Sequence, residues 1–141
     1  MANDGGDFAR SMSIATSGLR AQAGRMRVIS ENIANADSTA PTAAGDPYRR
    51  KIPTFSSELD RTLDAKVVAL GKVRPDASAF RVKHEPGNPA ADAAGNVKYP
   101  NVNPLIEMTD MRDAQRSYEA NLNVISATRR MVQRTLDILK S

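Results

Sequence analysis

The prolines divide this chain of 141 residues into three parts. All eight of them lie between Pro41 and Pro104, so neither end of the chain contains one. Proline removes a backbone donor and its ring clashes with the preceding turn, so it disrupts the interior of a helix. The distribution therefore predicts an N-terminal helix over residues 1–36, a broken middle segment over 37–102 and a C-terminal helix over 103–141.

Both predicted helices carry a heptad repeat of apolar residues. Alternating steps of four and three give eight apolar positions of nine in the first helix: Phe8, Met12, Ala15, Leu19, Gln22, Met26, Ile29, Ile33 and Ala36. They give eight of ten in the second: Met108, Met111, Gln115, Tyr118, Leu122, Ile125, Arg129, Val132, Leu136 and Leu139. A seam sustained for about four heptads favours a coiled coil. We expect a mainly α fold in which the two helices form one core domain, an antiparallel coiled-coil hairpin.

A second apolar column runs beside each seam. Its members are seven residues apart: Ile14, Ala21 and Val28 in the first helix, and Val124, Met131 and Ile138 in the second. The apolar stripes are thus wider than one partner helix covers. Two explanations stay open, namely that the extra columns pack on the chain's own middle segment or that they contact neighbouring subunits. The second predicts ends that are partly disordered in the monomer and helical in an assembly.

The middle segment has the pattern of a small β-containing, loop-rich element. Short extended runs at residues 51–55, 66–73, 79–85 and 96–99 are separated by turns rich in proline and glycine. Residues 56–64 are also compatible with a short helix.

Composition excludes most catalytic and metal chemistry. The chain has no cysteine and a single histidine, His84, which rules out a thiolate zinc site, a cysteine nucleophile and a two-histidine metal site. Phosphate-binding glycine loops and a nucleophile elbow are absent as well. We therefore predict no catalytic residue, no metal and no cofactor.

Charge and hydropathy limit the classes of partner and the locations that we expect for this chain. The net charge of +4 is spread as +1, +2 and +1 over the three parts, which disfavours a nucleic-acid-binding surface. The longest aliphatic run, residues 67–70, is far shorter than a membrane span or a signal-peptide core. We expect a chain that stays in the cytoplasm or is exported by a machine that reads an uncleaved N-terminus.

Two stretches of sequence resemble the bacterial flagellar rod and hook protein family. Residues 30–39, Ser-Glu-Asn-Ile-Ala-Asn-Ala-Asp-Ser-Thr, are similar to its signature, in which an N-terminal helix ends in Asn-Ile-Ala-Asn and runs on to a Thr-Pro-Gly-Tyr turn. Here residues 40–46 intervene, so a longer loop replaces the tight turn. The positions that carry the motif are Ala34, Asn35, Pro47, Tyr48 and Arg49. Residues 95–104, followed by Glu107-Met108 and by residues 116–121, resemble proximal-rod members in particular, as does the short length.

The resemblance implies a structural subunit of the proximal rod, without catalytic activity. Such a subunit polymerises through its terminal helices into a helical hetero-assembly that transmits torque for motility. Its implied partners are other proximal and distal rod proteins, basal-body ring and rod-base adaptor proteins, and the flagellar type III export apparatus. Its implied location is the basal body, in the periplasm after export without a cleaved signal. Nucleic acid and a membrane span are not expected.

The heptads identify the side chains that we expect to pack in this assembly. They are Leu19, Met26, Ile29, Ile33, Tyr118, Leu122, Ile125, Val132 and Leu136. A competing hypothesis is a soluble helical adaptor that binds one partner helix through a coiled coil.

Overall fold

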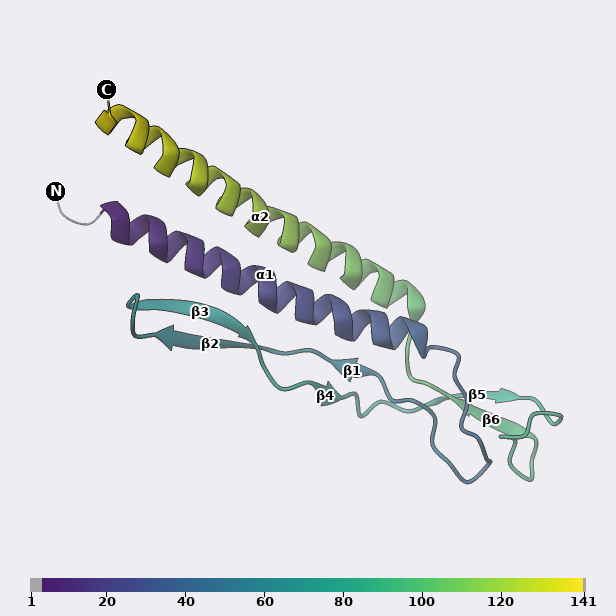
Figure 1. The fold of residues 1–141 in the computed structure, drawn as a ribbon. Coiled ribbons are helices and arrows are strands. Elements are labelled where there is room, and N and C mark those ends of the chain that lie inside the picture. Colours follow the sequence, from purple (N-terminus) through teal and green to yellow (C-terminus); the bar gives the residue numbers. More distant parts are fainter. Residues whose placement is uncertain (1–3, 141) are drawn as a thin grey trace. The chain divides into compact units, whose positions relative to one another are not determined.

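Two long helices are the main elements of the structure, a computed structural model that describes residues 4–140 (Figure 1). Helix α1 spans Asp4–Ala34 and helix α2 spans Pro104–Lys140. The start of α2 follows from Asn103 and Pro104. Asn103 Oδ1 accepts a hydrogen bond from the Leu105 N–H at 3.1 Å, and proline fits the first helical position because its missing donor would be unpaired there.

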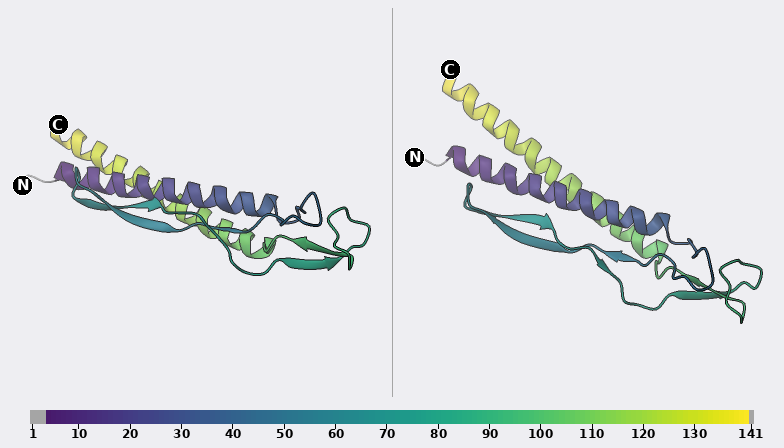
Figure 2. Two further views of the ribbon diagram at one scale, coloured as in Figure 1. Left: turned by 90° about the horizontal axis from the view of Figure 1, so that it is seen from below. Right: turned by 60° about the horizontal axis from the view of Figure 1, so that its bottom comes forward.

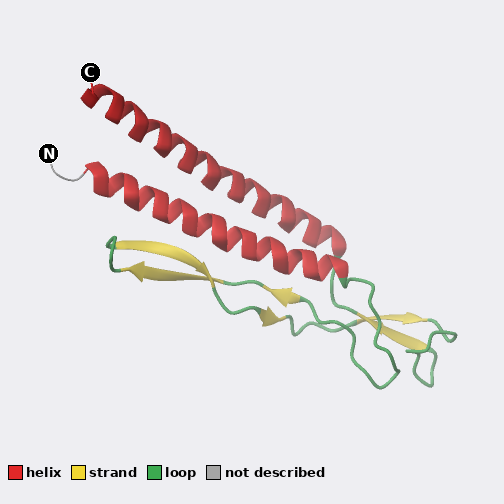
Figure 3. Ribbon diagram, in the orientation of Figure 1, coloured by secondary structure: helices red, strands yellow, loops and turns green. Residues whose placement is uncertain are grey.

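The middle of the chain forms three two-stranded antiparallel ribbons within the described residues (Figure 3). The strands pair as follows: β1 (Lys51–Ile52) with β4 (Arg74–Pro75), β2 (Phe55–Asp60) with β3 (Ala65–Leu70), and β5 (Arg81–His84) with β6 (Asn96–Tyr99). The prediction of a mainly α fold with a small β-containing middle segment is therefore confirmed.

Details of the strands differ from the expectation. The run at 51–55 is split around Pro53, because proline cannot donate to a ladder and Ile52 and Phe55 pair with different strands. The alternative of a helix over 56–64 is wrong, since β2 pairs residue by residue with β3. A turn closes this ribbon. The Asp60 carboxylate accepts the Thr62 N–H at 2.9 Å, and Asp64 has a φ of 47°, a conformation that aspartate tolerates better than most residues.

The chain divides into two compact units, and each takes segments from both helices and from the middle. Of the described residues, unit 1 contains 4–26, 54–72 and 113–140, whereas unit 2 contains 27–53 and 73–112. Each unit is described by itself below.

Unit 1 packs the β2–β3 ribbon along α1, as the views in Figure 2 show. The Ser17 hydroxyl accepts the Val68 N–H at 3.2 Å, and Arg10 Nε donates to the Leu63 carbonyl at 2.7 Å. Small residues make the close approach possible. A Cβ added to Gly18 would lie 2.8 Å from the side-chain amide of Asn121 in α2, so this side chain occupies the space that the glycine leaves.

Unit 2 has its core at the β5–β6 ribbon and at the ends of the two helices. The buried apolar side chains are Val28, Ile29, Ala36, Ala40, Ala90, Val97, Tyr99 and Val102. Asn32 and Glu107 are buried beside them, although both are polar.

The two extra apolar columns have different surroundings. In α1, Ala21 and Val28 are buried, and the pockets that they line have their other walls in the chain's own middle segment, β2–β3 in unit 1 and β4 in unit 2, whereas Ile14 is exposed. In α2 the corresponding residues Val124, Met131 and Ile138 are exposed. The first of the two explanations thus fits Ala21 and Val28, but neither Ile14 nor the column of α2. No helix between residues 4 and 140 is long and apolar enough to cross a membrane.

Candidate functional site

A buried asparagine, Asn32, lies at the centre of a hydrogen-bond network in unit 2. Its Oδ1 accepts from the Tyr48 hydroxyl at 2.8 Å and from the Lys51 N–H at 2.9 Å. Its Nδ2 donates to the Lys51 carbonyl at 2.8 Å and to Glu107 Oε2 at 3.0 Å. These four bonds use the full capacity of an amide side chain. One side chain therefore joins α1 to β1 and α2, and we call this set of contacts the Asn32 network.

Arg50 provides the positive charge beside Glu107, whose side chain is 1% exposed. Its Nε donates to Glu107 Oε1 at 2.5 Å, and its Nη1 lies 3.4 Å from Asp76 Oδ2. Burial alone would lower the pKa of Arg50, but the hydrogen bonds and charges of Glu107 and Asp76 outweigh it and raise that pKa above its ordinary value. Removing either partner of such a pair leaves an uncompensated charge in the interior.

The segment around Asp76 is held by local hydrogen bonds. The Asp76 carboxylate accepts the Ser78 N–H at 2.8 Å, and the hydrogen bonds from Ser78 are the main cause that lowers the pKa of Asp76, with Arg50 adding to it. Asn101 continues the network. Its Oδ1 accepts the Arg50 N–H at 2.8 Å, and its Nδ2 donates to the Ser78 hydroxyl at 2.9 Å.

A surface ion pair closes the network on the solvent side. Lys51 Nζ donates to Glu31 Oε2 at 2.9 Å, which lowers the pKa of Glu31 and raises that of Lys51. Burial raises the pKa of Tyr48, so the phenol stays protonated and keeps donating to Asn32.

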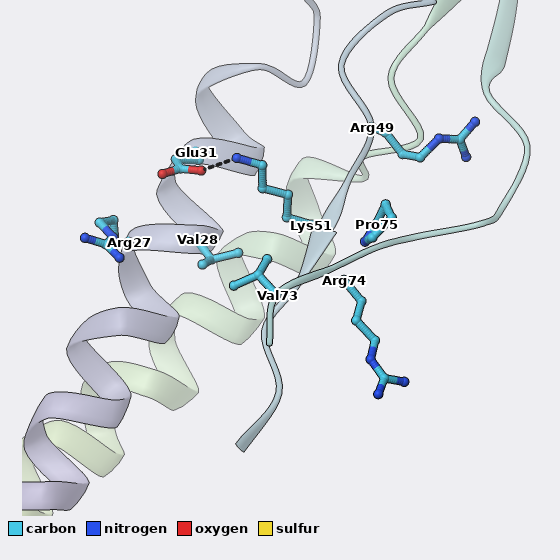
Figure 4. A pocket seen from close by; sticks show the side chains of 8 residues that line it. All are labelled: Arg27, Val28, Glu31, Arg49, Lys51, Val73, Arg74 and Pro75. Atoms are coloured by element: carbon cyan, nitrogen blue, oxygen red, sulfur yellow. Dashed lines mark hydrogen bonds and ion pairs between the residues drawn. The ribbon is translucent and has the colours of Figure 1, made fainter. Parts of the chain in front are cut away.

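A pocket of about 490 Å³ lies beside this ion pair, and its walls come from α1, β1 and β4 (Figure 4). Val28 and Val73 point toward one another across it, and its lining includes four cationic residues: Arg27, Arg49, Lys51 and Arg74. Arg49 is held by the Asp76 and Ser78 carbonyls and by the ring of Phe80. The ion pair of Glu31 and Lys51 is part of the pocket's wall, and the lining residues include no serine, threonine, cysteine or histidine.

Helix α2 leaves many large apolar side chains exposed. The exposed fractions run from 45% to 77% at Leu105, Ile106, Met108, Leu122, Val124, Met131, Leu136, Ile138 and Leu139. Single exposed apolar residues are ordinary, but a contiguous apolar face marks an interaction surface. The column Val124, Met131 and Ile138 is such a face, because residues seven apart lie on one side of a helix.

No metal-binding group is present in the part of the chain that the structure describes. Residues 4–140 contain no group of three histidine, cysteine, aspartate or glutamate side chains that could hold a metal ion. The exposed His84 has Asn96 Oδ1 3.4 Å from its Nδ1. What this arrangement can do is bind helices and strands together.

Comparison with known proteins agrees with the two stretches that carry the family motifs. The profile of the family described as "Flagella basal body rod protein" matches residues 12–40, and that of "Flagellar basal body rod FlgEFG protein C-terminal" matches residues 93–138. Among curated proteins, the flagellar basal-body rod protein FlgC of Agrobacterium fabrum is 56% identical over 91% of this chain and 92% of its own length. The chain belongs to the FlgC family of flagellar basal-body rod proteins.

More distant FlgC proteins match over the same extent. That of Bacillus subtilis is 39% identical over 92% of this chain and 97% of its own length. That of Salmonella typhimurium is 40% identical over 89% and 92%. The prediction of a structural rod protein of the flagellar basal body, and not an enzyme, is confirmed by this membership.

The structure gives the family motif a physical role. Pro47 is buried and positions Tyr48, whose hydroxyl reaches Asn32. Asn35 Nδ2 donates to the Glu31 carbonyl at 2.8 Å and so caps the end of α1, where Ala34 is the last helical residue. Arg49 fixes the segment 76–78. The longer loop at 40–46 thus still delivers the residues after it to the end of α1.

The side chains predicted to pack in an assembly fall into three classes of burial. Ile29 and Ile125 are buried within the chain, and Leu122 and Leu136 are 47% and 45% exposed. The remaining five are half-buried: Leu19, Met26, Ile33, Tyr118 and Val132. The buried stripe of α2 includes Glu107, Ala114 and Thr128, one position before the predicted column of Met108, Gln115 and Arg129.

Sequence reasoning gave Asn32 and Glu107 no role in packing, although both lie in the stretches that resemble the family. Asn32 and Glu107 are polar and lie next to apolar seam positions, so a count of apolar residues passes over them. The position of both residues relative to the predicted seams is a signal that could have identified them. Asn32 precedes the seam residue Ile33, and Glu107 precedes Met108, so both belong to the column one position before the predicted seam.

Proposed function

We propose that this FlgC family member polymerises with other rod proteins to build the proximal rod, with its terminal helices as the axial core. The exposed apolar side chains of α2 are the observation that carries the proposal. They remain in contact with water in the single chain, and burial of one such side chain contributes about 1.5–3 kcal/mol. Assembly with other helices offers that burial.

An antiparallel coiled-coil hairpin of α1 and α2 is part of the proposal, with residues 1–36 and 103–141 forming the core and 37–102 an outer, connecting part. One contact in each unit supports it. Gly18 lies against Asn121 in unit 1, and Asn32 is bonded to Glu107 in unit 2. The contacting residues are 14 positions apart on each helix. The residue number increases from Gly18 to Asn32 along α1, while that of the partner decreases from Asn121 to Glu107 along α2. Two heptads of an antiparallel pair give this spacing.

The proposed partners are other proximal and distal rod proteins, basal-body ring proteins and rod-base adaptor proteins. We further infer that the type III export apparatus delivers the chain unfolded to the periplasm without a cleaved signal. Helices that bury their apolar faces only on assembly couple folding to binding, which suits passage through a narrow channel. Helices packed parallel to a common axis would then form a stiff tube that transmits torque.

The test measures helicity and mass together. Circular dichroism and analytical ultracentrifugation of the purified chain over a wide concentration range should show helical signal that increases as the mass increases. A fully helical dimer whose signal does not change with concentration would instead support the soluble adaptor and overturn the rod proposal.

A further inference from the structure

The exposed column of α2 is bordered by cations that have no acidic partner in the described chain. Arg130 and Arg134 are exposed, and neither forms an ion pair with any residue from 4 to 140. They are four residues apart, so their like charges lie side by side on the helix and repel each other. Arg134 is also three residues after Met131 and four before Ile138, which places it directly beside the apolar column.

The charge of the whole C-terminal half of α2 has the same sign. Residues 123–140 contain four basic side chains, Arg129, Arg130, Arg134 and Lys140, and one acid, Asp137. An apolar column with a cationic border is complementary to a helix that has an apolar column with carboxylates beside it. Lysine or arginine on the facing helix would add repulsion.

A second copy of this chain does not supply that acidic helix. The described part of α1 has four arginines, at positions 10, 20, 25 and 27, against three acids, and the C-terminal half of α2 is itself basic. In the N-terminal half of α2, Glu107 is buried and Asp110 lies 3.7 Å from Arg50. The two exposed acids there, Asp113 and Glu119, are balanced by two exposed arginines, because Arg116 is three residues from each acid and Arg112 is next to Asp113. Like charges placed together across an interface disfavour the wrong partner.

We propose that the face formed by Val124, Met131, Ile138, Arg130 and Arg134 binds an acidic amphipathic helix of a different protein chain. The inference rests on the proposed rod function and names the chemistry of one neighbour in that assembly. A heptad column favours a helix over a lipid surface as the occupant, because it matches knobs-into-holes packing. Asp137, exposed among the cations, would also be repelled by anionic headgroups.

A designed peptide serves as the probe. The acidic probe is a synthetic peptide with the sequence of residues 122–140 in which the arginines at 129, 130 and 134 are replaced by glutamate. The basic probe has the natural sequence. The full chain should bind the acidic probe with an affinity that falls by about tenfold between low and high salt, and should not bind the basic probe. Equal binding of both probes overturns the proposal.

Matched variants locate the binding face. The variants Arg130→Glu/Arg134→Glu and Met131→Asp should each no longer bind the acidic probe. The control Arg112→Glu/Arg116→Glu makes the same change, four residues apart, elsewhere on α2 and should still bind it. Retention of the probe by the first two variants overturns the proposal. Self-association of the wild-type chain would also overturn the proposal if it becomes stronger at high salt and is removed by Met131→Asp. That result would identify a second copy of this chain as the occupant of the face.

Cells separate this proposal from the rod function. Arg130→Glu/Arg134→Glu should abolish swimming and incorporation into purified basal bodies, while the control pair swims. If the wild-type chain is found in rods and Arg130→Glu/Arg134→Glu swims normally, the rod function stands and the acidic partner is overturned. If the wild-type chain is absent from rods, the rod function itself has failed. Binding to phosphatidylserine vesicles that needs Arg130 and Arg134, without probe binding, also overturns the proposal.

Discussion

The two units use opposite means to hold α1 and α2 segments together. Unit 2 does so with buried polar groups that satisfy one another, Asn32 with Glu107 and Glu107 with Arg50. Unit 1 does so with small residues and a few apolar ones such as Ile125, and it leaves Leu136 and Met131 exposed. Unit 2 therefore contains the partners that its buried polar groups need. Leu105, Ile106 and Met108 are exposed there too, but the apolar column with members seven residues apart lies in unit 1, where a further molecule can cover it.

This difference suggests a division of labour within one subunit. A fully satisfied buried polar network favours one arrangement, because any shift leaves several groups without a partner. An exposed apolar column has no such constraint and gains when another helix packs on it. We expect unit 2 to set the geometry of the subunit and unit 1 to provide affinity for its neighbours.

The largest effect is expected from breaking the network at its centre. Asn32→Ala removes the partner of the Tyr48 hydroxyl, of both backbone groups of Lys51 and of Glu107 Oε2. Each buried group left unpaired costs about 1–3 kcal/mol, so unit 2 should lose at least ~3 kcal/mol of its free energy of unfolding. Denaturant titrations followed by tyrosine fluorescence measure the loss, and hydrogen exchange at the Lys51 amide should speed up.

The exposed Ser30 is the matched control for that experiment. Ser30→Ala removes a polar side chain from the same turn of α1 and should leave the exchange rate of the Lys51 amide unchanged. Equal destabilisation by the two variants would mean that the Asn32 network does not stabilise unit 2.

Asn32 also shows what pattern-reading can and cannot find. The helices and the strand 96–99 were predictable because period, proline and turn residues are local signals. Asn32 and Glu107 meet across 75 positions of sequence, and only the fold brings an amide and a carboxylate together there. In α2 the heptad count placed Ile125 correctly, but it put the column of Met108, Gln115 and Arg129 one position after the buried Glu107, Ala114 and Thr128. Apolar residues lie on both sides of the true contact line, so the count alone does not distinguish the two columns.

The second-largest effect is expected from placing a carboxylate at a buried position of unit 1, compared with an exposed position of the same unit. Ile125→Asp places a carboxylate where the side chain is 9% exposed and should destabilise the chain by about 2–4 kcal/mol. Leu136→Asp changes a side chain that is 45% exposed and should alter helicity little. Both should stop motility while the subunit is still secreted. Circular dichroism, a swimming assay and secretion measurements separate the two. Normal swimming of Leu136→Asp would show that this part of α2 is not an interface.

A smaller effect is expected at the close approach of the helices in unit 1. Gly18→Ala places a Cβ about 2.8 Å from the Asn121 amide, which must turn away and give up its hydrogen bond to the Ser117 carbonyl. Alanine in place of glycine favours the helix by about 1 kcal/mol, so the net loss should be ~1 kcal/mol or less.

The double variant Gly18→Ala/Asn121→Ala tests the cause. It removes the amide that the new methyl group meets, so it should be more stable than Gly18→Ala alone, with a coupling energy measurable by thermal unfolding. Purely additive effects would show that Asn121 does not pack against Gly18.

The smallest effect is a pH dependence that belongs to unit 2. Hydrogen bonds from Ser78, and then Arg50, lower the pKa of Asp76 in the folded chain, and the Tyr99 hydroxyl and Asn88 lower that of Glu85. A carboxylate whose folded pKa is below its unfolded one stabilises the fold above the unfolded value, and this stabilisation is lost as the pH falls through the folded value. The unfolding midpoint of unit 2 should therefore decrease from about pH 4 downward.

Asp76→Asn, which keeps an acceptor for Ser78, should reduce the slope of the unfolding midpoint against pH. Asp46→Asn, at an exposed carboxylate beside Lys98, is the control and should leave it unchanged. An identical slope in wild type and Asp76→Asn would exclude Asp76 as a source of the acid sensitivity.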